Sequence, residues 1–181
     1  ELVANALIHQ DMTITGAGPL VEMFTDRIEI TNPGQPLVQP ERFLDFPPRS
    51  RNEALAALMR RMRLCEEQGT GIDKVIVAVE LHQLPPPDFR KEGDAVRVVL
   101  YAPRRFAEMT PQERVRACYQ HAALKYLAGQ KMTNSTLRER FGIEPQNAAQ
   151  ASTVIRQALG TDLIRVADSA APRSGYVPYW A

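Results

Sequence analysis

Three polar residues at the start of the chain share a spacing of four. Glu1, Asn5 and His9 therefore lie on one face of a helix. The residues between them are almost all apolar, which predicts a buried helix over residues 1–9. A carboxylate and a carboxamide on the remaining stripe suit hydrated Mg²⁺ with phosphate, where Asn5 supplies an oxygen to the metal and Glu1 acts as the base toward a water. The alternative is a solvated stripe on an amphipathic helix.

The stretch Glu1-x-x-x-Asn5-Ala6 resembles the first motif of the GHKL ATPases, the superfamily of gyrase, chaperone, histidine-kinase and mismatch-repair ATP sites. Their second motif, strand-Asp-x-Gly, reads the adenine amino group, and residues 30–34 correspond to it. Their third motif is a glycine-rich turn that opens a helix beside the phosphates, and residues 69–72 take its place. The resemblance implies ATP and Mg²⁺ as cofactors, with Asn5 on the metal and a nucleotide set of Asn5, Asn32, Gly34, Gly69, Thr70 and Gly71.

A narrower resemblance is to the RecG-related transcriptional regulators. It rests on Glu-Leu-Val-x-Asn-Ala-Leu-Ile-His-x-Asp at 1–11, Phe-x-Asp-Arg-Ile-Glu-Ile-x-Asn-Pro-Gly at 24–34, Arg-Asn at 51–52 and Glu-x-Gly-x-Gly-Ile at 67–72. Such regulators join a Schlafen-type AlbA domain, a reduced GHKL-like domain and a C-terminal winged helix. Because the chain opens inside a helical pattern, we expect a further domain upstream.

The chain departs from the GHKL pattern at several points. Asn32 or Thr31 stands where the superfamily has its adenine-reading Asp, and Pro33 removes a backbone amide. The segment before the third motif is short for a closing lid, and the substitutes for a phosphate-binding lysine are Arg49, Arg51 and Lys74. The chain also lacks the P-loop of a helicase motor. We therefore expect a binding protein, with weak ATP hydrolysis at most; a Mg²⁺-dependent ATPase acting on DNA is the alternative.

A second group of candidate residues lies near the C-terminus. The stretch 137–143 resembles the second helix and turn of bacterial winged-helix regulators, whose third helix enters the major groove. Here that helix runs from about 146 to 159, and Gln and Asn pair with adenine while Arg pairs with guanine. The loop between two short strands that follow suits contact with phosphate or the minor groove. The predicted contacts to double-stranded DNA are Gln146, Asn147, Gln150, Thr153, Arg156, Arg173 and Ser174. The alternative is a module that docks protein.

The pattern before residue 104 predicts the elements that position the first group. Strands are expected at 20–24 and 27–30, a turn at 32–34, helices at 52–63 and 72–81, and a strand at 96–100. The apolar face of the helix at 52–63 is expected to include Leu58 and Met62, and its arginines, Arg60, Arg61 and Arg63, are expected in solvent, with phosphate contact as the alternative. This order predicts an α+β fold, a GHKL-like α/β sandwich over 1–103.

The remainder predicts a winged helix-turn-helix domain over 108–181. Thr110, Pro111 and Glu113 have the pattern of a helix start with a capping box, and Thr133 caps a second helix. Glycine at 142 breaks the chain before the third helix. Two strands, at 163–166 and 176–179, then form the terminal hairpin.

The amino-acid composition limits the classes of protein to which the chain can belong. Apolar residues make up 44% and charged residues 24%, as in ordinary folded proteins. No stretch of bilayer-spanning length is free of charge, which excludes a membrane helix. Cys65 and Cys118 are isolated, which argues against metal and disulfide frameworks and for the cytoplasm. From residue 108 onward the chain has nine basic and six acidic residues, whereas the part before it has thirteen basic and fifteen acidic residues. This asymmetry favours DNA, bound by a homodimer because the excess charge is small.

Overall fold

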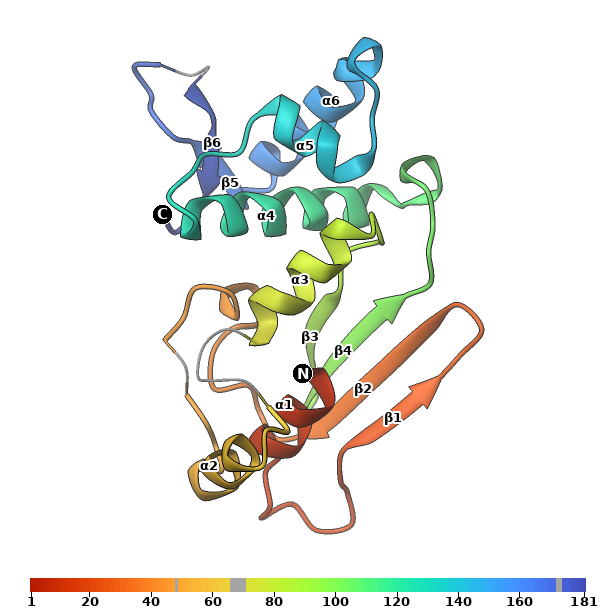
Figure 1. Ribbon diagram of the computed structural model, residues 1–181, viewed down its shortest axis with the longest axis vertical. Helices are drawn as coiled ribbons and strands as arrows, with labels where there is room; N and C mark the ends of the chain where they lie inside the picture. Colours follow the sequence, from red (N-terminus) through yellow and green to blue (C-terminus); the bar gives the residue numbers. More distant parts are fainter. Residues whose placement is uncertain (48, 66–70, 172–173) are drawn as a thin grey trace. The chain divides into compact units, whose positions relative to one another are not determined.

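The computed structural model describes residues 1–47, 49–65, 71–171 and 174–181 (Figure 1). The chain divides into two compact units: unit 1 comprises residues 1–76 and 87–102, and unit 2 comprises residues 77–86 and 103–181. Helices and antiparallel strands occur together, which confirms the predicted α+β class.

Unit 1 is built on a four-stranded antiparallel sheet with the order β1-β2-β4-β3. Its strands are β1 (Leu20–Met23), β2 (Arg27–Pro33), β3 (Asp88–Glu92) and β4 (Ala95–Tyr101). In the centre of the sheet, Ile30 pairs with Val98 and Asn32 pairs with Val96. Antiparallel partners point to the same face, so an apolar surface forms beside the single amide of Asn32.

Helix α1 (Leu2–His9) packs between this sheet and helix α2 (Glu53–Arg61), as Figure 1 shows. Leu2 and Ala6 pack against Ile30 and Val98 of the sheet. The other side of α1 packs against α2, through Ala4, Ile8, Ala56 and Met59. Burial on two sides explains the nearly continuous apolar sequence of α1, and the larger buried side chains, Leu2 and Ile8, each contribute roughly 1.5–3 kcal/mol.

Two residues just before α2, Arg51 and Asn52, form hydrogen bonds with the C-terminal end of α1. Arg51 Nε donates to the carbonyl of His9 (3.1 Å), and Asn52 Nδ2 donates to the carbonyls of Ile8 (2.9 Å) and Gln10 (2.8 Å). These bonds satisfy carbonyl groups that a helix end leaves without partners. The Arg-Asn pair therefore has a structural role.

The structure corrects three expectations for unit 1. Asn32 and Pro33 belong to β2, and the chain turns at Gly34, whose φ is +113°. Strand β3 was not expected; its sequence is mostly charged, which hides an edge strand. Leu58 of α2 and Met62, the residue that follows this helix, were expected inside but are 52% and 58% exposed.

Unit 2 contains three helices, α4 (Pro111–Leu127), α5 (Asn134–Phe141) and α6 (Ala148–Gly160), followed by two paired strands, β5 (Ile164–Val166) and β6 (Tyr176–Pro178). Helix α3 (Gly71–Leu81) supplies residues 77–81 to this unit and its earlier residues to unit 1. Short 3-10 turns, η1 (Pro40–Arg42), η2 (Phe106–Glu108) and η3 (Pro145–Asn147), lie in the connections.

The helix ends of unit 2 follow the predicted capping pattern. Glu113 Oε2 accepts from the backbone amide of Thr110 (2.8 Å), while Thr110 Oγ1 accepts from that of Glu113 (3.2 Å). Thr133 caps α5, and Gly142 ends it with φ of +62° in the left-handed region. The core between α4, α5 and α6 includes the fully buried Leu137. Burial in this core raises the pKa of the Cys118 thiol to about 12.

Candidate functional site

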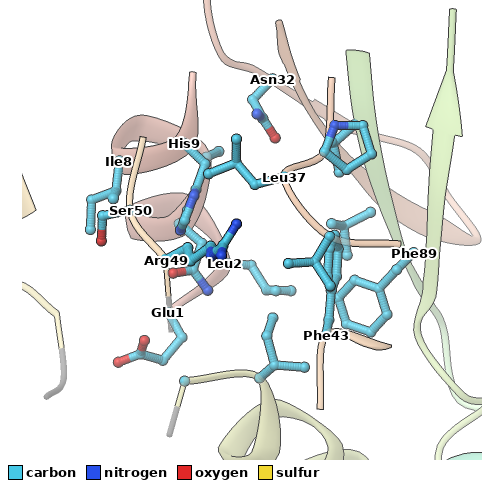
Figure 2. Close-up of a pocket in the computed structure, with 18 of the residues that line it drawn as sticks. Glu1, Leu2, Ile8, His9, Asn32, Leu37, Phe43, Arg49, Ser50 and Phe89 are labelled. Atoms are coloured by element: carbon cyan, nitrogen blue, oxygen red, sulfur yellow. The ribbon is translucent and has the colours of Figure 1, made fainter. Parts of the chain in front are cut away.

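A cavity of about 200 Å³ lies in unit 1 between α1, the sheet and the loop before α2 (Figure 2). Glu1, Asn5 and His9 all line it. The polar stripe of α1 therefore faces a hollow, as the chemical interpretation of its spacing requires.

The cavity has a polar side and an apolar side. In Figure 2, Glu1, His9, Arg49 and Ser50 gather on one side. The other side carries aromatic rings, including Phe43 and Phe89, whose centres are 5.8 Å apart in an edge-to-face arrangement. Aliphatic side chains of α1 and the sheet complete the apolar wall: Leu2, Ala6, Ile30, Val96 and Val98. Such a cavity suits a ligand with a flat apolar ring and a polar or charged end.

Asn32 is the one polar side chain that the sheet presents to this cavity. The residue is only 6% exposed, and its side chain points into the cavity (Figure 2). Within the described residues its amide makes no hydrogen bond. The amide therefore offers one donor group and one acceptor to a ligand.

Glu1 and Asn5 meet the first residue of α3 at the edge of the cavity. A β-carbon added to Gly71 would lie 2.7 Å from Glu1 Oε2 and 3.6 Å from Asn5 Nδ2. Glycine at this position therefore lets the carboxylate approach the N-terminal end of α3. Mg²⁺ is usually held by one or two carboxylates together with substrate phosphates. Glu1 supplies one such carboxylate, and Asn5 adds an amide oxygen. The described residues contain no cluster of three or more His, Cys, Asp or Glu.

His9 contributes a neutral ring to the polar side. Burial lowers its pKa below the usual 6.5, and the charge of Arg51 lowers it further. The ring is therefore uncharged at neutral pH and acts through hydrogen bonding.

Arg49 and Arg60 are the cationic side chains that line the cavity within the described part of the chain. Arg49 was among the expected phosphate ligands, whereas Arg60 was expected in solvent. Of the other candidates, Arg51 is engaged with α1, and Lys74 does not line the cavity. The neighbouring Arg61 is exposed, as expected. The contact of Arg60 depends on how α2 packs on α1, and helical spacing alone does not reveal it.

Gly34 lies outside the lining of the cavity. A β-carbon added there would lie 2.8 Å from Cβ of Asp11, and the positive φ favours glycine independently. Its requirement for glycine is therefore explained by packing. Gly69 and Thr70, also expected at the nucleotide, lie outside the described residues.

The predicted DNA contacts of unit 2 fall into two groups. Those in and before α6 are all exposed: Gln146 and Asn147 in η3, and Gln150, Thr153 and Arg156 in α6. Thr153 Oγ1 also donates to the carbonyl of Ala149 (3.0 Å). In the loop between β5 and β6, the hydroxyl of Ser174 is buried and has no hydrogen-bond partner among the described residues, while Arg173 lies outside them. The exposed candidates therefore lie in η3 and along α6.

Unit 2 also contains a buried ionic group that sequence reasoning missed. Glu80 Oε2 lies 2.9 Å from His121 Nδ1, and Glu80 Oε1 lies 3.5 Å from Arg140 Nε. Arg140 Nη2 donates to the carbonyl of Leu84 (2.8 Å). Burial lowers the pKa of Arg140, and Glu80 opposes that shift. The group joins α3, α4 and α5 within unit 2.

Comparison with known protein families finds a match that lies mostly in unit 1. The family described as "Putative ATP-dependent DNA helicase recG C-terminal" matches residues 16–100. No curated protein matches the chain. None of the helices in the described ranges combines the length and the apolar character of a membrane span.

Among solved structures, the DIP2311 protein from Corynebacterium diphtheriae is similar to 98% of this chain, with a TM-score of 0.53 and 22% sequence identity. The chain spans 40% of the length of that structure. At this level of identity the likeness concerns the fold alone. The family match supports an ATPase-like region of the RecG-related kind at residues 16–100.

Proposed function

We propose that unit 1 is a reduced GHKL-like domain that binds an adenine nucleotide, and that unit 2 is a winged helix-turn-helix that binds double-stranded DNA. The chain then acts as part of a cytoplasmic transcriptional regulator. One observation carries the nucleotide site. Glu1, Asn5, Asn32 and Gly71 belong to three separate motifs, yet all four line one cavity.

The two sides of the cavity suggest how the nucleotide lies. The adenine ring takes the apolar side, beside Phe43 and Phe89, where the amide of Asn32 pairs with the donor and acceptor on the edge of the base. The phosphates point toward the polar side, where α3 begins at Gly71 and the positive end of its dipole favours an anion.

The DNA-binding proposal rests on unit 2 alone. Helices α5 and α6 follow one another through the left-handed turn at Gly142, and the paired strands β5 and β6 come next, as in a winged helix. The exposed row along α6 carries amides and one cation, Arg156. Because affinity for DNA comes largely from phosphate contacts, one copy binds weakly, and a homodimer supplies a second recognition helix.

Electrophoretic mobility of a duplex library at low and high salt tests this proposal. We expect retention at low salt that the double variant Gln150→Ala/Arg156→Ala weakens by at least roughly tenfold, since a good base contact contributes about 1–3 kcal/mol. Gln112→Ala, exposed on α4, is the matched control. Absence of any retained duplex at low salt would refute DNA binding by this chain.

A second candidate function is Mg²⁺-dependent hydrolysis of ATP. The approach of the Glu1 carboxylate to Gly71 favours it, because a base there is close to the proposed phosphate position. Glu1 takes a proton from the water that attacks the terminal phosphorus, and ADP leaves. Glu1→Ala is then expected to abolish turnover without abolishing ATP binding. A wild-type chain with no turnover in the presence of Mg²⁺ rules this candidate out.

A further inference from the structure

We propose that Arg49 and Arg60 form the anion subsite of the unit 1 cavity, so that two guanidinium groups neutralise the ligand phosphates and binding needs no Mg²⁺. The inference rests on the proposed nucleotide site and adds the group that recognises its charged end. It assigns a role to two arginines of which the sequence pattern singled out one.

The charges that line the cavity favour an anionic ligand. Among the described residues, the lining carries two cations, Arg49 and Arg60, and one carboxylate, Glu1, while His9 is neutral at neutral pH. Figure 2 places Arg49 on the same side as Glu1 and His9, opposite the rings of Phe43 and Phe89. An excess of positive charge beside an apolar wall suits a molecule with a flat ring and an anionic end.

Within the part of the chain that the structure describes, both guanidinium groups have donors left for a ligand. The Cζ of Arg49 lies 6.0 Å from the centre of the Phe46 ring, a cation–π contact that leaves its donors unused. Arg60 is half-buried, and neither arginine forms an ion pair or a side-chain hydrogen bond within the described residues. Arg51 differs, because it already donates to His9 and Asp11. A guanidinium with free donors binds phosphate oxygens in pairs.

The size of the cavity places the phosphates at its rim. A volume of about 200 Å³ lies below the roughly 300–1,000 Å³ of sites that enclose a whole drug-sized ligand. The cavity therefore encloses the base and sugar, and the phosphates extend toward Arg49, which is exposed. Among the described lining residues Glu1 is the one carboxylate that could hold a metal ion, so Arg49 and Arg60 supply most of the positive charge that faces the phosphates.

Isothermal titration calorimetry of the chain with adenosine, AMP and ADP, in EDTA and then in Mg²⁺, tests the subsite. We expect ADP to bind at least roughly tenfold tighter than adenosine in EDTA, as charge-assisted hydrogen bonds predict. The double variant Arg49→Gln/Arg60→Gln is expected to bind ADP no better than adenosine. Arg61→Gln, on the same helix but outside the lining, is the matched control and keeps the preference.

The outcomes separate the two claims. If neither adenosine nor ADP binds the wild-type chain, the proposed nucleotide site itself fails. If ADP binds only with Mg²⁺, or if the double variant keeps the wild-type preference for ADP, the nucleotide site stands and the arginine subsite is wrong. Circular dichroism of each variant establishes that it is folded before its affinity is compared.

Discussion

The substitution Gly34→Ala distinguishes a packing role from a ligand-binding role at a position that motif comparison assigned to the nucleotide. Gly34 has φ of +113°, and an added methyl group would lie 2.8 Å from Cβ of Asp11. Asp11 cannot easily withdraw, because its carboxylate accepts from Thr13 Oγ1 (2.6 Å) and from Arg51 Nη1 (3.2 Å). We therefore expect the substitution to destabilise unit 1.

The magnitude follows from two contributions. A non-glycine residue held in so sparsely populated a backbone region costs about 1–3 kcal/mol. Overpacking by one methyl group adds roughly 1–3 kcal/mol. Gly16→Ala is the matched control, because Gly16 also has a positive φ, +78°, but nothing lies within 4 Å of its added β-carbon. The control therefore loses only the backbone contribution, about 1–2 kcal/mol.

Urea unfolding followed by far-ultraviolet circular dichroism measures the difference. Slopes of about 1–3 kcal/mol per molar urea convert the expected gap of about 1–3 kcal/mol into roughly 1 M between the two midpoints. Equal midpoints for the two variants would contradict the packing explanation. Unchanged stability with lost ADP binding would return Gly34 to the ligand site.

Two further predictions concern buried residues that can carry a charge, Glu80 with Arg140 and His9. Glu80→Ala leaves the guanidinium of Arg140, whose side chain is 1% exposed, without its carboxylate, and we expect the free energy of unfolding to fall by about 3–5 kcal/mol. The fluorescence of Trp180 during unfolding measures this loss. Glu139→Ala, at an exposed position, is the control, and equal losses in the two variants would refute the role of the pair. The pKa of His9 in the folded chain lies below 6.5, so its contribution to stability is present above that pH and declines as the pH falls. His9→Gln should therefore reduce the loss of stability between about pH 6.5 and 5, measured by urea unfolding at each pH. An unchanged slope of stability against pH would contradict burial of the neutral ring.

Local signals in the sequence predicted much of the fold. The predicted capping box at Thr110 and the predicted cap at Thr133 place the starts of α4 and α5 correctly, because these bonds join residues three apart and need no tertiary context. The helix at the N-terminus and the strand at Arg27 were likewise predicted from short-range periodicity.

Elements that depend on partners far along the chain were missed. Strand β3 reads as charged because ion pairs along and across the strands, such as Arg90 with Asp88 (3.1 Å) and Arg97 with Glu92 (2.8 Å), replace the usual apolar alternation. The pairing of Glu92 with Ala95 across two residues is a hairpin turn, and its Gly-Asp sequence was the signal that would have revealed the strand.

The residues of the candidate site likewise divide into those that local motifs predicted and those that depend on packing between elements. Motif comparison named Glu1, Asn5, Asn32 and Gly71, and the structure places all four on the cavity. The aromatic side was not predicted, and Arg60 was not distinguished from Arg61 and Arg63, because each reaches the cavity through packing between elements rather than through spacing within one.

Hydrogen–deuterium exchange with and without ADP tests the central claim most directly, because it reports where a nucleotide binds. We expect slower exchange in peptides from α1, β2 and residues 71–76, which together contain the cavity-lining motifs, while peptides from α6 remain unchanged. Exchange that is identical with and without saturating ADP, or protection confined to unit 2, would contradict a nucleotide site in the cavity of unit 1.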